Sequence, residues 1–597
     1  MKPNHFVKGR QFLLLLILSI LFSGLAPCFA SNGHEVKPKG DLNNKKILDV
    51  FGKVVNPHNT GVGDVELEVL VNGKEAEIVG NGGHKGHGKA SIKTEADGTF
   101  QFKVALPEEL DIKSNEISIR AFKPSYKDTI FKIDSSKIAQ IGNEYMVRAD
   151  LKIERTTGPA FWIATVVFIL AYILISFELL HRTLAAMLGA AIMLVISYTF
   201  GTFNPEYHIL SYEAAIHAID MNVILLLMGM MIIVGILKNT GVFQWSAYKC
   251  YKLAKGNVMT LSIILMSFTA VASAFLDNVT TMLLLTPVSI EIALSLGISP
   301  LALLIPEVLA SNIGGTATLI GDPPNIMIGS YAGLTFLDFV IELTPVCIIS
   351  MLVLFFYTKF VYGNEYSRAK ITDIDAFIEK LRQEYQITDA HLLTVGGIIM
   401  AMVIGMFLTH GILHMEVCIA AIFGASLLFS YGILTKKIDL LHLIEKDIEW
   451  PTLLFFMFLF ILVGAVEETG LLDLIADWVL NLSSGNLTAA ICLILWVSAI
   501  MSAFVDNIPF TATMLPIVGY LTQVIPGADS GVLWWALAFG ACFGGNGTMI
   551  GASANVVTLG IAESAGYPIK FFGFMKVAFI YMIISVAIAN AWLLLVF

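Results

Sequence analysis

Two Asp-Asn pairs stand inside apolar stretches, where they are candidates for binding a small cation or a proton. The first pair, Asp277 and Asn278, lies in SAFLDNVTTMLLLTP, and the second, Asp506 and Asn507, lies in SAFVDNIPFTATMLP, 229 residues later. An ionisable residue in an apolar stretch is costly and is by default a functional candidate. Carboxylate and amide oxygens are hard ligands of the kind that suit Na⁺ or a proton. The motifs therefore predict a site for one of these two ions.

A second pair of matching segments follows the first. GGTATLIGDPPN ends at Asn325, and GGNGTMIGASAN ends at Asn555, 230 residues later. Two copies of a unit this long indicate an internal duplication. Gly and Pro interrupt helices, and an interrupted helix exposes carbonyl groups that coordinate cations and amide groups that favour anions. Asp322 adds an acid to the first copy, where the second copy has Ala552.

The polar residues and glycines of these motifs form two candidate ion- or substrate-binding clusters, one in each copy. The first cluster consists of Ser273, Asp277, Asn278, Thr280, Thr281, Ser311, Asn312, Gly314, Gly315, Thr316, Thr318, Asp322 and Asn325. The second cluster consists of Ser502, Asp506, Asn507, Thr511, Thr513, Gly544, Gly545, Asn546, Thr548, Ser553 and Asn555.

The charge pattern around the two aspartates sharpens this prediction. No Lys or Arg stands between Lys255 and Lys359, and none stands between Lys446 and Lys570. An unpaired ionised Asp buried there would cost several kcal/mol. Either a cation or a proton must compensate, and competition between the two at one carboxylate is the basis of cation/proton exchange. The structural alternative is that both aspartates only cap helices through backbone N–H groups.

Composition defines the setting of these motifs. The 597-residue chain is 56% hydrophobic and only 14% charged, which indicates a polytopic membrane protein whose surroundings are a lipid bilayer. Its net charge of −10 argues against a nucleic-acid partner. Six cysteines lack CxxC spacing, and neither a P-loop nor a nucleophile motif is present. We therefore expect no enzyme activity, and no cofactor beyond Na⁺ as a coupling ion.

The N-terminus has the layout of an export signal over residues 1–30. Basic residues precede an apolar run, and small residues follow, with Cys28 and Ala30 at the −3 and −1 positions. An uncleaved signal anchor is the alternative, and a lipoprotein at Cys28 fits poorly because Pro27 precedes it. Each possibility places the following segment across the membrane.

Residues 31–157 predict a water-exposed β-sandwich outside the cytoplasm. Alternating runs such as VELEVLV and FQFKVAL, with NG and DG turns between runs, indicate short antiparallel strands. The pattern resembles carboxypeptidase-regulatory-like and other Ig-like modules of exported proteins. His84 and His87 are compatible with a metal clip, but without an acidic or Cys partner nearby a flexible loop tip is favoured. We interpret this domain as accessory.

The remainder predicts two transporter repeats, 158–388 with a cytoplasmic loop and 389–597. Apolar segments long enough to cross the membrane recur near 159–177, 183–203, 221–237, 339–361, 389–410, 414–433, 451–466 and 571–595. The motifs interrupt four others, at 258–294, 299–330, 487–524 and 532–562. Interrupted segments at matching positions of two halves point to a transporter binding site.

Basic residues predict the orientation of these segments. Lysines and arginines follow the segments at 221–237 and 339–361, so both ends should face the cytoplasm. The first repeat's leading segment then runs inward and the second's, at 451–466, runs outward. The duplication is therefore predicted to be inverted, with one re-entrant hairpin entering from each side. KCYKLAK and LLDLIADWVLNL fit interfacial helices that join scaffold and hairpin.

Several long motifs resemble a known family. LDNVTTMLL, SNIGGTATLIGDPPN, VDNIPFTATMLP, ALAFGACFGGNGTMIGASANVV, FELLHRTLAAMLGA and LLLMGMMIIVGILKNTG are similar to the P protein group of the ion transporter superfamily, beside its arsenite-pump and NhaD-type sodium/proton antiporter families. The resemblance covers the chain from about residue 160 to its end. It implies an all-α elevator fold with a dimerising scaffold, two re-entrant hairpins and two broken helices, and hence a homodimer.

The resemblance also implies ligands by position. Na⁺ is expected at Asp277 and Asn278 with Ser273 and Gly314, and at Asp506 and Asn507 with Ser502 and Gly544. The sodium/dicarboxylate branch of the superfamily carries Ser-Asn-Thr at its hairpin tips, where this chain has Asp-Asn. Two fixed negative charges argue against carboxylate symport.

We therefore expect a secondary active transporter that couples or exchanges Na⁺ and H⁺, in the inner membrane of a bacterium. A Na⁺-driven transporter of organic anions or oxyanions is the alternative. A passive anion conductance or its regulator, with the sandwich binding a partner, is a third. Other charged residues are expected at the membrane interface, and for two of them, His410 and His414, a pH-sensing role is the alternative. These residues are Glu291, Glu307, Glu467, Glu468, His217, His410 and His414.

Overall fold

The structure is a computed structural model that describes residues 45–56, 61–63, 65–79, 84–86, 89–95, 97–107, 115–123, 125–141, 144–177, 179–369 and 374–597. The export signal predicted over 1–30, with Cys28 and Ala30, lies outside the described residues, as do His87 and the side chain of His84. The chain divides into two compact units, a β unit and a helical unit that comprises Ile153–Phe597 together with Phe122–Thr129.

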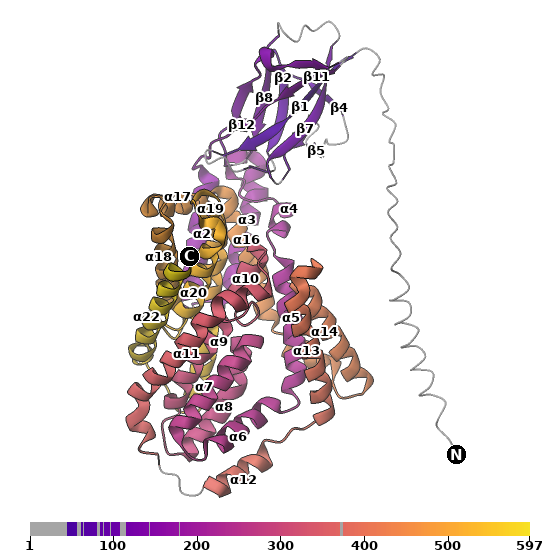
Figure 1. The fold of residues 1–597 in the computed structure, drawn as a ribbon. Coiled ribbons are helices and arrows are strands. Elements are labelled where there is room, and N and C mark those ends of the chain that lie inside the picture. The colour runs from indigo at the N-terminus through magenta and orange to yellow at the C-terminus, as the bar shows by residue number, and fades with distance from the viewer. Residues whose placement is uncertain are drawn as a thin grey trace, which may run out of the picture. The chain divides into compact units, whose positions relative to one another are not determined.

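The β unit contains two six-stranded sheets (Figure 1). Its strands are β1 (Lys45–Val55), β2 (Glu66–Val71), β3 (Lys74–Glu75), β4 (Glu77–Val79), β5 (His84–Gly86), β6 (Lys89–Lys93), β7 (Thr99–Pro107), β8 (Ile117–Phe122), β9 (Thr129–Lys132), β10 (Ala139–Ile141), β11 (Glu144–Arg148) and β12 (Leu151–Lys152). One sheet has the order β10-β11-β1-β7-β4, with β12 beside β1, and the other has the order β5-β6-β2-β8-β9, with β3 beside β2.

Alternating side chains build the core of the β unit, as the strand pattern predicted. Leu48, Val50, Val69, Val104 and Ile119 are fully or almost fully buried. The prediction of purely antiparallel pairing is wrong at one place, because β1 pairs in parallel with β11 and β12. A parallel pair needs a long crossover between its strands, and here the chain that forms the second sheet supplies it.

The helical unit is that of an integral, multi-pass membrane protein. In the described part of the chain, 11 helices are long and apolar enough to cross a membrane. They are α2 (Pro159–Ser176), α3 (Arg182–Phe203), α5 (Met221–Lys238), α7 (Val258–Phe275), α8 (Asn278–Ser295), α11 (Phe336–Tyr366), α13 (Ala390–Leu413), α14 (Val417–Leu434), α16 (Trp450–Thr469), α18 (Leu487–Phe504) and α22 (Phe571–Val596). The other helices are α4 (Tyr212–His217), α6 (Val242–Ala254), α9 (Leu301–Thr316), α10 (Pro323–Ala332), α12 (Ile374–Glu384), α15 (Leu440–His442), α17 (Leu471–Ser483), α19 (Asn507–Val524), α20 (Val532–Gly544) and α21 (Ser553–Ser564).

Helix breaks fall inside the motifs. α7 ends and α8 begins at LDN, and α18 ends and α19 begins at VDN. The paired breaks 317–322 and 545–552 separate α9 from α10 and α20 from α21. Pro323 and Pro324 begin α10, where their missing N–H groups cost no intrahelical hydrogen bond.

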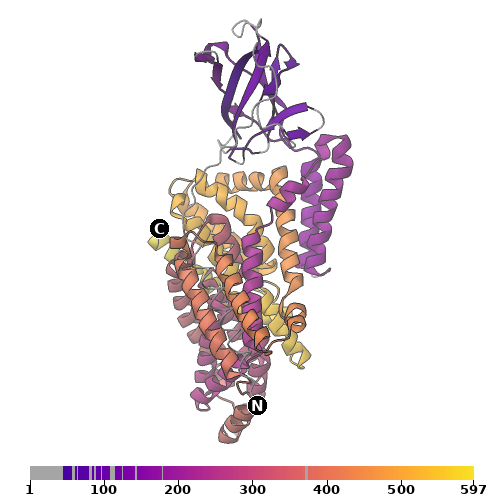
Figure 2. The same cartoon turned by 90° about the vertical axis from the view of Figure 1, so that its right-hand side faces the viewer.

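Helix packing repeats between the two halves of the unit. α7 packs on α9 as α18 packs on α20, and α8 packs on α21 as α19 packs on α10. α5 packs on α14, and its counterpart α16 packs on α3. Two amphipathic helices precede the helical hairpins α7–α8 and α18–α19. These helices, α6 and α17, lie at opposite ends of the unit (Figures 1 and 2).

Basic segments predicted to face the cytoplasm meet at one end of the helical unit. α12 packs on α6, and Lys238 at the end of α5 lies 3.8 Å from Asp447. Lys437 donates a hydrogen bond of 2.7 Å to Asp389, the residue that caps α13. This hydrogen bond lowers the pKa of the Asp389 carboxyl.

Two equivalent glycines let the helices of each half approach closely. A Cβ atom at Gly314 would overlap the carbonyl group of Ala270 on α7, and one at Gly544 would lie 2.5 Å from the carbonyl oxygen of Ala499 on α18. The absence of a side chain therefore allows α9 and α20 to contact a neighbouring backbone directly.

We predict that Gly314→Ala destabilises the protein by about 1–3 kcal/mol, because the added methyl group must push α7 and α9 apart. Thermal unfolding of the detergent-solubilised protein measures this effect. Gly397→Ala is the matched control, because Gly397 lies on helix α13 with no atom near its Cβ position. Equal melting temperatures for the two variants would contradict the close packing.

Candidate functional site

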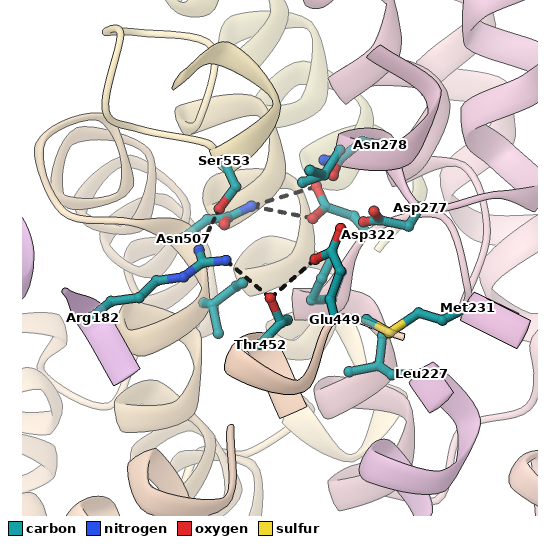
Figure 3. Close-up of a pocket in the computed structure, with 13 residues that line it drawn as sticks. Arg182, Leu227, Met231, Asp277, Asn278, Asp322, Glu449, Thr452, Asn507 and Ser553 are labelled. Carbon is teal, nitrogen blue, oxygen red and sulfur yellow. Dashed lines mark hydrogen bonds between the residues drawn. The ribbon is translucent and has the colours of Figure 1, made fainter. Parts of the chain in front are cut away.

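One pocket lies where several helices begin and where the two halves of the helical unit meet (Figure 3). Its lining comes from the first residues of α3, α8, α10, α16, α19 and α21, together with α5. The lining residues are Arg182, Leu227, Met231, Asp277, Asn278, Val279, Asp322, Pro323, Glu449, Thr452, Asn507, Ile508 and Ser553.

Asp277 caps α8 and also lines the pocket. Its Oδ2 accepts hydrogen bonds from the backbone N–H of Thr280 at 3.0 Å and from the Thr280 hydroxyl at 3.1 Å. The capping role considered from the sequence is therefore present at this position, and Thr280 serves the cap. Among the described residues no Lys, Arg or His forms an ion pair with Asp277. The same carboxylate therefore caps a helix and lines the pocket.

Asp322 is the most deeply buried acid of the pocket, with 1% of its surface exposed. It precedes Pro323 and Pro324, which have no N–H group to donate, and its side chain accepts no cap hydrogen bond from α10. The Asn507 amide donates to the two Asp322 carboxylate oxygens across 3.3 and 3.5 Å, and the Cys542 thiol is a further neighbour. Within the described residues Asp322 has no cationic partner either.

Asp506 differs from Asp277, and here the prediction of two acids without a basic partner is wrong. Nη1 of Arg182 lies 3.3 Å from Asp506 Oδ2, and the two side chains are 27% and 15% exposed. The same guanidinium donates to Ser553 at 2.7 Å and to Thr452 at 3.3 Å (Figure 3). The absence of Lys and Arg from the duplicated motifs did not reveal this partner, because Arg182 lies on α3, outside both motifs.

Four asparagines connect the two halves behind the pocket. Asn278 donates to Asn312 at 3.3 Å, and Asn312 donates to Asn546 at 2.9 Å and to Asn555 at 3.0 Å. Asn325 and its counterpart Asn555 donate to carbonyl groups of the breaks, at Thr318 and Thr548 respectively among others. These amides satisfy the open helix ends in the interior of the protein.

The other predicted site residues hold the helices together and do not line the pocket. Their hydroxyl groups form hydrogen bonds with adjacent helices. Ser273 bonds to the Ser311 hydroxyl, and Ser502 donates to the Ala541 carbonyl. Thr281, Thr316, Thr511 and Thr513 each bond to a carbonyl one turn earlier in their own helix, and Thr318 and Thr548 bond to the carbonyls of Ala274 and Ala503. The glycines allow close approach, as Gly315 does at Gly321 and Gly545 at Gly551.

The structure thus brings five predicted site residues together in one pocket, namely Asp277, Asn278, Asp322, Asn507 and Ser553. Sequence reasoning missed Arg182, Glu449 and Thr452, which bond to one another in the order Arg182–Thr452–Glu449. Arg182 was visible in FELLHRTLAAMLGA as the basic residue that opens an apolar segment, a position that flanking residues commonly occupy.

Two of the residues expected at the interface are buried. Glu307 is 1% exposed inside α9. His410 is also buried, where its Nε2 accepts from the backbone N–H of Phe336 at 3.1 Å. Glu291, in contrast, is partly exposed and bonds to Lys380 and Tyr385. Glu467 and Glu468 end α16, and His217 and His414 lie exposed at helix ends.

A multi-pass helical unit with broken helices around a charged pocket defines a membrane transport protein, and the relatives agree. The profile of the family described as "Citrate transporter" matches residues 172–540, and the chain belongs to this family. An uncharacterized transporter of Mycobacterium tuberculosis is 42% identical over 433 residues, which cover 72% of this chain and 97% of that protein. A 46 kDa membrane protein of Mycobacterium leprae is 41% identical over 432 residues, with the same shares of 72% and 97%.

The resemblance to the P protein group is confirmed. Human P protein is 35% identical over 507 residues, which cover 72% of this chain and 59% of the human protein. Among solved structures, the YdaH transporter of Alcanivorax borkumensis aligns with a TM-score of 0.49 and 12% identity, over 69% of this chain and 98% of that one.

We predict that Arg182→Gln lowers stability by about 1–3 kcal/mol, because it leaves the Asp506 carboxylate without its charged donor. Adding Asp506→Asn to this variant should recover part of the loss, since the unpaired charge is then gone. Thermal unfolding in detergent measures both. The control is Arg382→Gln, which removes an arginine whose ion pair with Glu379 is largely exposed and contributes little. Additive losses in the double variant would show that the pair is not coupled.

Proposed function

We propose that this protein is a secondary active transporter that exchanges Na⁺ and H⁺ at the carboxylates of Asp277 and Asp322. The observation that carries the proposal is the charge balance of the pocket. Three carboxylates, Asp277, Asp322 and Glu449, face one guanidinium, Arg182, which already pairs with Asp506. The excess negative charge favours a positive occupant.

The magnitudes support this choice. The N-terminal ends of α8 and α10 carry partial positive charge, but such an end contributes at most about 2 kcal/mol to a nearby carboxylate. A buried carboxylate without a partner costs several kcal/mol. The Asp322 side chain lacks even a cap hydrogen bond from α10, so a proton or a cation must supply most of the compensation.

The proposed site is therefore centred on the acids of the first half, Asp277 and Asp322. Sequence symmetry suggested equivalent Na⁺ positions at Asp277 with Asn278 and at Asp506 with Asn507. The ion pair with Arg182 and the additional acid Asp322 favour a single position, to which the amide oxygens of Asn278 and Asn507 add hard ligands. Na⁺ and H⁺ would then compete for the same carboxylates, and neither could bind while the other does.

The arrangement of the hairpins supports an elevator mechanism. α6 and α17, which precede α7 and α18, lie at opposite ends of the unit, yet the tips at Asp277 and Asn507 line one pocket. Two hairpins that start at opposite ends and meet in the middle cannot both cross the membrane, so we propose inverted, re-entrant hairpins. The ion would move with them past a scaffold that includes α3, and two copies would dimerise through that scaffold.

We predict that purified protein in liposomes accumulates radioactive sodium when a pH gradient is imposed, and that Asp277→Asn and Asp322→Asn each reduce this uptake at least about tenfold. A tenfold loss corresponds to about 1.4 kcal/mol of binding free energy, less than the contribution expected of a ligating carboxylate. Asp529→Asn is the matched control, because Asp529 is exposed in a short turn outside the pocket. Full uptake by both pocket variants would refute the proposal.

Arg182 favours a second candidate, Na⁺-driven transport of an organic anion. Its guanidinium lines the pocket and could bind a carboxylate, as the description of the family suggests. We expect no sodium-driven uptake of radiolabelled citrate in the same liposomes, because three carboxylates repel that anion. Citrate uptake that is lost in Arg182→Gln would favour the second candidate over cation exchange.

A further inference from the structure

Glu307 is a buried carboxyl group that the proposed exchange site does not include. It lies inside α9 with 1% of its surface exposed. The Ser289 hydroxyl on α8 donates to its Oε1 at 2.9 Å, and its Oε2 has no hydrogen-bond partner. No Lys, Arg or His of the described residues pairs with Glu307. An ionised carboxylate in this position would be uncompensated, whereas a protonated one leaves only a single hydroxyl without a partner.

The titratable groups that face Glu307 do not neutralise it. They are the Cys250 thiol on α6 and the Tyr366 hydroxyl on α11. The Tyr366 hydroxyl donates at 2.6 Å to the carbonyl of Ala302, which Pro306 leaves without its intrahelical donor. The tyrosine therefore compensates for the proline, and its proton is already engaged.

Buried polar groups lie along α8 and α9 between Glu307 and the pocket. On α9, Ser311 follows one turn later and contacts Ser273 at 3.1 Å. Its neighbour Asn312 accepts from Asn278, which lines the pocket. On α8, Thr286 lies buried between Ser289 and Asn278, and its hydroxyl has no hydrogen-bond partner. We call this row of polar residues the α8–α9 seam.

Glu307 and several polar residues of the seam have no polar counterpart of the same kind in the second half. At the position of Glu307 the second half has Leu537, and at the positions of Ser311 and Asn312 it has Ala541 and Cys542. The half that carries Glu307 is the half that carries Asp322. In the described helical unit, the two fully buried acids without a basic partner thus occur on one broken helix pair, α9 and α10.

We infer that Glu307 is a second proton-binding site, which exchanges its proton with the pocket along the α8–α9 seam. The inference rests on the proposed function for its role in coupling. The Glu307 carboxyl gives its proton to a hydroxyl of the seam, which passes its own proton on toward the pocket, and a proton arriving from the end of the unit where α9 begins protonates the Glu307 carboxylate again. Because α9 begins beside the C-terminal end of α11, where the Tyr366 hydroxyl bonds to the Ala302 carbonyl, this end is the one where the basic segments meet.

Infrared spectroscopy of the purified protein tests the protonation directly. At neutral pH we expect the difference spectrum between wild type and Glu307→Gln to contain the C=O stretching band of a protonated carboxylic acid. The matched control is Glu291→Gln on α8, which removes an acid bonded to Lys380 and should remove carboxylate bands instead. Carboxylate bands alone in the Glu307→Gln difference would overturn the inference. Glu307→Leu, which copies the second half of the chain, repeats the measurement if Glu307→Gln does not fold.

Transport measurements separate coupling from ion binding. Glu307→Gln and Glu307→Leu should lose pH-driven sodium accumulation but retain the exchange of radioactive sodium for sodium at equal pH. Retention of both activities, or loss of both in a folded variant, would overturn the role in coupling. Failure of the proposed function looks different, because Asp277→Asn would then leave pH-driven uptake intact while the infrared result on Glu307 stands.

Discussion

Open helix ends in the interior of an apolar protein constrain the rest of this structure. Each broken helix leaves N–H and C=O groups that neither lipid nor an apolar core can satisfy. Here Asn325 and Asn555 bond to the carbonyls of their own breaks, and Thr318 and Thr548 bond to the preceding hairpins. Once these groups are satisfied, the hairpin tips are held against the breaks, and the remaining polar side chains converge on one pocket.

Close backbone contact is the second part of this arrangement. The hydrogen bonds from Thr318 and Thr548 require α7 and α18 to lie directly against α9 and α20, and Gly314 and Gly544 allow that distance. Small residues at helix contacts are the usual means of bringing helices together in a membrane, where hydrophobic burial gives little driving force. The glycines of the motifs thus act through packing, and the acids act in the space that the packing leaves.

Symmetric packing supports asymmetric chemistry. The two halves share their helix pairs, yet in the sequence alignment of the halves Asp322 corresponds to Ala552 and Glu307 corresponds to Leu537. Arg182 then neutralises the acid of the second half and leaves that of the first without a partner. The duplicated fold thus contains one negatively charged pocket. The two acids that occur only in the first half, Asp322 and Glu307, lie on the broken helix pair α9 and α10.

The sequence alone determined the membrane class, the helix breaks, the duplication and the family, because apolar length, Gly and Pro positions and long motifs are local properties of the chain. It also located five of the pocket residues. Tertiary structure decided which acids are neutralised, since Arg182 meets Asp506 from 324 residues away. It also decided that Glu307 and His410 are buried. The sequence of a helix reveals which of its faces are apolar, but it does not reveal which neighbouring helices cover each face.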